Sequence, residues 1–407
     1  GRGRRDGRHE GRSRGNNGRG NPGARMEKGN LMTSRTPVCK VPYWTYMREI
    51  DRCEERMVSA IWRVLHSGRV ILGAEVLAFE REFAAYVGSR NAVGLNSGTD
   101  AIVIGLLACG LKPGDEVITV PNTAVPTVAA IRQAGGDPVF VDVDPETLLI
   151  DPARIADRLT SHTRAIVPGH LYGQAADMES ILAIAEAAGL FIVEDCAQAH
   201  GTRYRDRMAG TFGKVGAYSF YPTKPLGAYG DAGACVTSDD SASAFIRAYR
   251  EYGTREGVAI MARGMNSRLD EIQAAVLREK LWDLDPALER RRRIAEIYDL
   301  AFRGTRIKPV GKPHEPGSAR SHYVYVIRIG KYRDLVRERL AALGIETRIH
   351  YPVPIHLMPG FEFMGYPKGS FPEAERGADE ILSLPMFPGM TEEEARIVSK
   401  AVIECAV

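Results

Sequence analysis

The sequence lacks any apolar run long enough to cross a membrane. Its longest uncharged apolar stretch runs from Ala101 to Gly110, and a membrane-spanning helix needs about 20 apolar residues. It also shows no signal peptide, because the N-terminus has no apolar central region and no small-residue cleavage site. We therefore expect a cytoplasmic protein without a membrane partner.

Cysteine is scarce and scattered. The 407 residues contain six cysteines, and no two of them form a C-x-x-C pair. This pattern argues against a disulfide framework and a zinc site, and it indicates a reducing compartment. No H-E-x-x-H or comparable spacing is present, so no metal is expected.

Positive charge is concentrated at the N-terminus. Residues 1–25 contain eight arginines against Asp6 and Glu10, a net charge of +6; since the whole chain carries +3, the remainder carries −3. The Gly/Arg-rich segment 1–30 is predicted to be disordered, because it cannot bury apolar surface. It is either an RNA-binding tail or an extension upstream of the first methionine, Met26. The rest has no basic stripe, so nucleic acid is not expected to bind the folded body.

What the sequence does contain is a regular alternation of strand and helix patterns from about residue 90. The clearest helix, 177–189, can be capped by Asp177 and Gly189. Strands that are apolar on both faces and separated by helices form parallel sheets covered on both sides. We therefore predict an α/β fold whose large domain has three α/β/α layers and a mostly parallel mixed sheet. The predicted strands are 91–95, 115–120, 137–143, 164–168, 190–195, 216–220 and 233–238.

The C-terminal third predicts a smaller α/β domain. Its strands are expected near 322–329 and 346–351. The proposed division of the chain is an N-terminal segment that packs with the small domain, a large domain and the small domain. Their bounds are 31–66, 67–285 and 286–407.

Two helices are expected between these strand regions. One begins at Asn266-Ser267, where Ser267 and Asp270 can form a capping box. The other carries the basic run "ERRRRIAEIY" (289–298), which is predicted to be the solvated face of a connecting helix.

Chemically useful groups follow several predicted strands, where open α/β sheets bind ligands. Ser97 and Thr99 in "NSGTDA" open a helix and suit either a phosphate or a plain N-cap. Asp195 is either a structural cap or ion pair, or a counter-ion for a protonated ring nitrogen. Lys224, five residues after Ser219, lies among aromatics, prolines and glycines, where shielding from water favours Schiff-base chemistry. Together these groups suit pyridoxal 5′-phosphate (PLP).

Longer motifs carry a family resemblance. "SGTDA", "HLYGQ" (170–174), "VEDCAQAHG" (193–201), "SFYPTKPLGAYGDAG" and "GMNSRLDEIQAA" (264–275) resemble the DegT/DnrJ/EryC1 sugar aminotransferases, within the aspartate aminotransferase fold type I superfamily. The resemblance runs from about residue 40 to "HYPVPIH" (350–356) and "SLPMFPGMT" (383–391). It implies a PLP-dependent transaminase in amino-sugar biosynthesis. Nitrogen would pass from an amino acid, with L-glutamate expected, to the C3 or C4 ketone of a nucleotide-linked deoxysugar.

Two alternatives stay open at this stage. One is a keto-cyclitol aminotransferase of the scyllo-inosose type, from an aminoglycoside pathway. The other is a non-catalytic PLP-fold regulator or RNA-associated protein. Some relatives carry histidine in place of the lysine and are dehydratases, so Lys224 favours transamination.

The resemblance also implies roles for individual residues. Lys224 matches the lysine that forms a Schiff base with the cofactor and shuttles a proton. Asp195 matches the residue that keeps the ring nitrogen protonated, and Gln198 matches a contact near the ring hydroxyl. The phosphate cradle is matched by Ser219, Gly98 and Thr99.

Other positions concern the second subunit and the substrate. Asn266 matches a residue that reaches the neighbouring subunit's cofactor, which implies a homodimer with shared sites; by itself it would be a helix cap. Ala124 stands where the family commonly has an aromatic that stacks on the ring. The histidines His170 and His200 are expected near the site without a catalytic role. The candidate substrate residues are Arg348, Tyr351 and His356. The alternative is that their segment serves only as a rigid turn.

Overall fold

The computed structural model describes residues 41–312 and 316–406. The predictions for the Gly/Arg-rich segment 1–30, both its disorder and RNA binding, lie outside the described residues. Within the described ranges, no helix combines the length and apolar character needed to cross a membrane.

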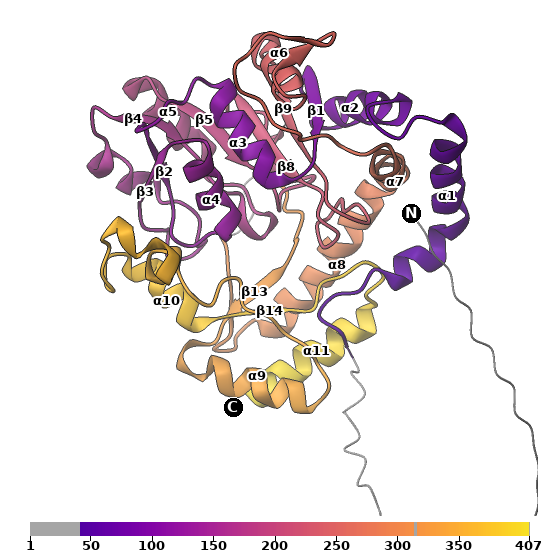
Figure 1. The fold of residues 1–407 in the computed structure, drawn as a ribbon. Helices are drawn as coiled ribbons and strands as arrows, with labels where there is room; N and C mark the ends of the chain where they lie inside the picture. Colours follow the sequence, from indigo (N-terminus) through magenta and orange to yellow (C-terminus); the bar gives the residue numbers. More distant parts are fainter. Residues whose placement is uncertain (1–40, 313–315, 407) are drawn as a thin grey trace, which may run out of the picture. The chain divides into compact units, whose positions relative to one another are not determined.

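A seven-stranded sheet forms the centre of the larger part of the fold (Figure 1). Its strand order is β1-β9-β8-β5-β4-β2-β3, and only β9 runs antiparallel to its neighbours. This confirms the predicted mixed, mostly parallel sheet. The first residue of each strand is within one position of the predicted one. The strands are β1 (Asn91–Leu95), β2 (Glu116–Thr119), β3 (Asp137–Phe140), β4 (Thr163–Ile166), β5 (Phe191–Asp195), β8 (Val215–Ser219) and β9 (Gly233–Thr237).

Helices cover both faces of this sheet, which makes the three predicted layers. Alternate side chains of β1 show the division: Val93 packs into the core under α3, α4 and α6, and Ala92 packs into the core under α2 and α7. Helix α5 covers the second face near β4 and β5. The bounds are α2 (Ala74–Val87), α3 (Gly98–Ala108), α4 (Val125–Gln133), α5 (Met178–Ala188), α6 (Asp240–Tyr249) and α7 (Glu271–Trp282).

The capping pattern of α5 is as predicted. The Asp177 carboxylate accepts a hydrogen bond from the Ser180 backbone, and Gly189 ends the helix in the left-handed conformation. The start of α7 differs from the prediction, because this helix begins at Glu271 and its N-cap residue Asp270 makes no side-chain cap hydrogen bond. The Ser267 hydroxyl donates to Asp100 at 2.7 Å instead, so the predicted capping box is wrong.

A second, three-stranded antiparallel sheet lies in the C-terminal part of the chain. It contains β12 (Lys308–Pro309), β13 (Tyr325–Arg328) and β14 (Ile381–Leu384). The predicted strand 346–351 is wrong: the segment makes a single bridge, from Arg348 to Ser383, before it turns away from the sheet. The helices of this part are α8 (Leu284–Phe302), α9 (Arg333–Ala342), α10 (Pro372–Glu380) and α11 (Glu392–Cys405).

The basic run on α8 is only partly a solvated face. Arg291 is 5% exposed, and its guanidinium donates to the backbone carbonyls of His322, Tyr323 and Met386. Burial lowers the pKa of Arg291 from 12.5 to about 10. This arginine therefore joins α8 to two C-terminal segments, because carbonyl oxygens replace the water it has lost.

The N-terminal segment contacts both parts of the chain. Val41 lies in the core of the C-terminal part, and Arg48 forms an ion pair with Glu394 of α11. Helix α1 (Met47–Ser67) then packs along α7, at the right-hand edge of Figure 1. The proposed boundaries at 66/67 and 285/286 remain proposals, because residues 39–407 form one compact unit.

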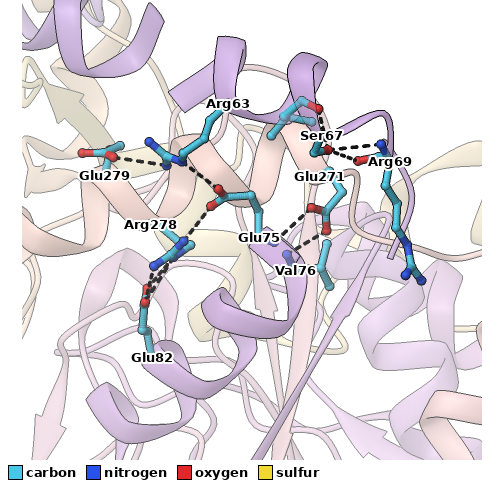
Figure 2. Close-up of polar contacts among 10 residues, drawn as sticks. Arg63, Ser67, Arg69, Glu75, Val76, Glu82, Glu271, Arg278 and Glu279 are labelled. Atoms are coloured by element: carbon cyan, nitrogen blue, oxygen red, sulfur yellow. Dashed lines mark hydrogen bonds and ion pairs between the residues drawn. The ribbon is translucent and has the colours of Figure 1, made fainter. Parts of the chain in front are cut away.

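A polar network centred on the buried carboxylates of Glu75 and Glu271 joins α1, through Arg63, to α2 and α7 (Figure 2). The Glu271 carboxylate, 2% exposed, accepts hydrogen bonds from the backbone N–H groups of Gly73, Glu75 and Val76 at 2.7 to 2.9 Å. These N–H groups lie at the start of α2 and have no partner within the helix. The Glu75 side chain in turn binds Arg278 of α7 at 2.7 Å. A residue of α7 thus caps α2 across 195 positions of sequence.

Two short hairpins complete the described strands. Strands β6 (Arg203–Tyr204) and β7 (Arg207–Met208) form one of them, and β10 (Thr254–Arg255) and β11 (Val258–Ala259) form the other.

Candidate active site

A cavity of about 390 Å³ opens where β1, β2, β4, β5 and β8 end. These are the carboxyl ends of the parallel strands, the predicted location of a ligand site. Three side chains from the C-terminal part, Tyr323, His350 and Tyr351, close the cavity on another side. The sequence-predicted residues that line it are Gly98, Thr99, Asp195, Gln198, Ser219, Lys224 and Tyr351.

One end of the cavity suits an anion such as a phosphate. Helix α3 begins at Gly98, and the first N–H groups of a helix have no intrahelical acceptor. A Cβ on Gly98 would lie 2.5 Å from the Ser219 Cβ, so only glycine lets this helix start approach the end of β8. The Ser97 hydroxyl caps the helix by accepting from the Asp100 backbone, and the Thr99 and Ser219 side chains line the same end of the cavity.

Asp195 provides a negative charge on the cavity wall. Its side chain accepts hydrogen bonds from the Thr127 hydroxyl at 2.7 Å and from the Ala197 backbone N–H at 3.0 Å. Among residues 41–312 and 316–406, no cationic side chain forms an ion pair with it. A carboxylate only 9% exposed is costly to keep without a cation, so the site suits a ligand that brings a positive charge.

Lys224 lies in the loop after β8 and also lines the cavity. Its ammonium nitrogen is 4.6 Å from the centre of the Tyr323 ring, and the Tyr323 hydroxyl is 3.0 Å from that of Thr223. Within the part of the chain that the structure describes, no carboxylate forms an ion pair with Lys224. The aromatic ring therefore takes the place of an anionic partner, which leaves the amine available for chemistry.

Gln198 links the cavity wall to the C-terminal part. Its side-chain oxygen accepts from the Tyr172 backbone at 2.7 Å, and its side-chain nitrogen donates to the Tyr351 hydroxyl at 3.1 Å. The Tyr172 hydroxyl donates to the His350 carbonyl at 2.7 Å. These bonds fix the segment that was predicted as a strand, and they hold His350 and Tyr351 against the cavity.

His170 lines the cavity as expected and His200 does not. Three of the predicted cofactor and substrate residues also lie outside its lining. Asn266 is exposed and is held near Glu251 by a backbone bridge. Arg348 lines a neighbouring cavity of about 360 Å³, where its guanidinium lies over the Tyr43 ring. His356 is buried and bound to Glu375 at 3.0 Å, so the structure does not support a substrate-facing side chain at this position.

A possible metal cluster lies beside the cavity. Ligand atoms of His170, Glu194 and Cys196 lie within 4.8 Å of one another. His170 accepts from the Ala176 backbone through Nδ1 and binds Glu194 through Nε2. Burial raises the pKa of the Cys196 thiol, which disfavours the thiolate that a metal needs. The protein's own hydrogen bonds satisfy His170 and Glu194, so we assign no metal here.

Two functional residues were missed by sequence reasoning. Thr127 follows Thr123 by one helical turn, but nothing in the sequence indicates that its hydroxyl reaches Asp195. Tyr323 lies within the predicted strand 322–329, and its contact with Lys224 spans 99 positions of sequence. Ala124 lines the cavity. Its side chain is a methyl group, so this position supplies no aromatic ring to stack on a ligand.

Two histidines, His200 and His350, make the fold sensitive to acid. Burial, followed by the charge of Lys224, lowers the pKa of His200 from 6.5 to about 3 and that of His350 to about 4. Between pH 6.5 and those values, the unfolded chain binds protons that the folded protein does not. Stability is therefore expected to rise with pH across this window, by up to about 1.4 kcal/mol per pH unit for each histidine.

Urea unfolding between pH 4 and 7.5 measures this effect. His200→Phe keeps a ring between Tyr218 and Phe220 and should flatten the pH dependence of the unfolding free energy. An unchanged slope in this variant would show that His200 does not contribute.

Comparison with known proteins agrees with this geometry. The sequence model of the DegT/DnrJ/EryC1/StrS aminotransferase family matches residues 51–403. A protein of Micromonospora megalomicea subsp. nigra named dTDP-3-amino-3,4,6-trideoxy-alpha-D-glucose transaminase is 43% identical, over 89% of this chain and 97% of its own. A protein of Geobacillus stearothermophilus named pleiotropic regulatory protein is 42% identical, over 89% of this chain and 98% of its own.

Solved structures extend the agreement to three dimensions. The structure of DesV from S. venezuelae, in complex with a ketimine intermediate, has a TM-score of 0.87 and 42% identity, over 90% of this chain and 98% of that one. The predicted fold class and family are both confirmed. The chain belongs to the DegT/DnrJ/EryC1/StrS aminotransferase family.

Proposed function

We propose that this aminotransferase uses PLP to move an amino group from L-glutamate to the C3 or C4 ketone of a nucleotide-linked deoxysugar. The observation that carries the proposal is the meeting of Lys224, Asp195 and the Gly98–Ser219 contact in one cavity. An amine, a buried carboxylate without a cationic partner and a helix start that suits an anion match the three polar ends of PLP.

The cofactor supplies an aldehyde that carries nitrogen and an aromatic ring that draws electrons from the bond being broken. The residues proposed to hold its phosphate are Gly98, Thr99 and Ser219. Asp195 is proposed to keep the ring nitrogen protonated, and Gln198 to contact the hydroxyl side of the ring. Each of these groups lines the cavity.

Lys224 is proposed to hold the cofactor between reactions and then to move a proton to and from the substrate carbon. A free amine is needed for both tasks, and the Tyr323 ring, 4.6 Å from Nζ, shields one side of it from water. Thr223 and Tyr323 bind each other, so the loop that carries Lys224 is fixed to the C-terminal part. The proton donor and acceptor is thereby held at a defined place.

The choice of substrate is supported by the relative from Micromonospora megalomicea, which is named for a dTDP-linked amino sugar. Tyr351 lines the main cavity, and Arg348 lines a second cavity that shares Thr223, Tyr323 and His350 with it. We propose that these two residues contact the sugar nucleotide. Residues 67–285 would then form the PLP-binding domain, and 286–407 the small domain.

A substrate panel tests the proposal. Purified enzyme loaded with PLP is incubated with L-glutamate, and 2-oxoglutarate is measured with a dTDP-linked 3-keto-deoxysugar, its 4-keto isomer or scyllo-inosose as acceptor. Turnover with a nucleotide sugar is expected. Turnover with scyllo-inosose alone would favour a keto-cyclitol aminotransferase, and a protein that binds PLP without any turnover would favour a regulator, as the Geobacillus relative is named.

We also propose that the enzyme acts as a homodimer in the cytoplasm with shared active sites. Asn266 is exposed and does not line the cavity of its own chain. It lies beside the β10–β11 hairpin. Large apolar side chains are exposed on and near this hairpin, which suits an interface between two copies. They are Tyr252 (57%), Val258 (65%) and Ile260 (48%).

Mixed dimers provide a prediction for Asn266. Lys224→Ala and Asn266→Ala should each be impaired, and re-association of a mixture should regain about a quarter of the wild-type sites. The reason is that half of the dimers would be mixed, and one of their two sites would combine an intact Lys224 with the partner's Asn266. Activity of the re-associated mixture is measured against the separate variants. A mixture no more active than their average would contradict site sharing.

A further inference from the structure

Asp195 is held by a chain of two buried hydroxyls from the start of α4. The Thr127 Oγ1 lies 2.7 Å from Asp195 Oδ2 and 3.0 Å from Thr123 Oγ1. Thr127 is 1% exposed and Thr123 is 4% exposed. At such burial the two threonine hydroxyls are well shielded from water, so their hydrogen bonds are strong.

The direction of this chain follows from the chemistry of its end. An ionised carboxylate can only accept hydrogen bonds, so the Thr127 hydroxyl donates its single proton to Asp195. Thr127 Oγ1 is then free to accept from Thr123. The second carboxylate oxygen accepts from the Ala197 backbone N–H at 3.0 Å. Each oxygen thus has one protein donor, and the remaining lone pairs are left for the cavity.

We propose that Thr127 is a positioning residue that orients the Asp195 carboxylate toward the cofactor ring by donating to Oδ2. This inference rests on the proposed function. A hydrogen bond to a charged acceptor is stronger than one between neutral groups, so it holds the carboxylate in one orientation. Thr123 polarises the Thr127 hydroxyl and strengthens its donation.

The position of Thr127 in the first turn of α4 makes this role specific. Ala124, the N-cap residue of α4, lines the cavity, and Thr127 lies three positions later on the same side of the helix. The first helical turn therefore provides both the space at Ala124 and the donor to Asp195. A shift of α4 would move both together, which couples the shape of the cavity to the charge on its wall.

Thr127→Val tests this proposal, because valine keeps the β-branched shape and removes the hydroxyl. The pH midpoint of the cofactor's visible absorbance and the kcat and KM for L-glutamate are measured in protein loaded with PLP, and the dissociation constant for PLP is measured by titrating the apoprotein. We expect a midpoint shifted to higher pH, because a less cationic ring lets the lysine-linked nitrogen keep its proton. PLP affinity and kcat should each fall on the order of tenfold, the effect of losing a hydrogen bond to a charged group. KM should change little.

Two further variants separate this role from a structural one. Thr127→Ser should restore the midpoint and most of the affinity. Thr119→Val is the matched control, because it removes a buried hydroxyl that donates to the Val167 carbonyl at 3.0 Å outside the cavity; it should lower thermal stability without moving the midpoint. If Thr127→Val behaved like this control, the inference would be overturned. Failure of the wild-type protein to bind PLP would instead overturn the proposed function.

Discussion

Replacement of Lys224 by alanine is expected to abolish amino-group transfer. The rate should fall by at least about 10⁴-fold, the upper range for loss of a positioned proton donor and acceptor. Within the described residues that line the cavity, no other lysine is present, so no neighbouring amine can replace it. The covalent link to the cofactor should be lost as well.

Two measurements check this expectation. Borohydride reduction followed by peptide mass spectrometry should place the cofactor on Lys224 in the wild type and find no adduct in the variant. Lys214→Arg is a suitable control, because Lys214 is an exposed lysine paired with Asp239 away from the cavity. A Lys224→Ala protein that transferred nitrogen at the wild-type rate would refute the proposed mechanism.

Replacement of Glu194 by alanine is expected to lower the free energy of unfolding strongly. This carboxylate is fully buried, binds His170 Nε2 at 2.9 Å and accepts from three backbone N–H groups at 2.6 to 2.7 Å. The donors are those of Gly210, Phe212 and Gly213. Removal of one partner from a buried charged network costs about 3–5 kcal/mol, because the remaining groups stay buried without partners.

Urea unfolding followed by circular dichroism measures this loss. Glu186→Ala, an exposed glutamate on α5, is the control and should change stability by no more than about 0.5 kcal/mol. A loss below about 1 kcal/mol for Glu194→Ala would mean that water or a rearranged loop satisfies the same donors. Because His170 lines the cavity, PLP affinity should weaken together with stability.

The strand and helix pattern of the large sheet could be predicted from the sequence. Its strands are short runs of residues that are apolar on both faces. Apolar character belongs to each residue, so its pattern can be read from the local sequence. The site could be placed for a related reason. Asp195 and Ser219 end β5 and β8, and Gly98 follows the end of β1 by three residues. Parallel strands bring their carboxyl ends to one edge.

Predictions failed where a polar side chain had more than one possible hydrogen-bond partner. Ser267 fitted a capping box with Asp270, but it binds Asp100, which comes from a different helix. Arg291 lay in a basic run typical of a solvated face, but three carbonyl groups of the C-terminal part surround it. His356 fitted a substrate loop, but Glu375 binds it. In each case the partner is absent from the local sequence.

The sequence by itself determined the order of the layers and the edge at which the cavity opens, and it placed Lys224 at that edge. These features follow from apolar periodicity and from residue chemistry, which are both local. Only the tertiary structure decided which groups hold Asp195, which ring shields Lys224 and which carboxylate caps α2. Those contacts join residues up to 198 positions apart, and they form because folding buries polar groups that must find a partner wherever the packed chain supplies one.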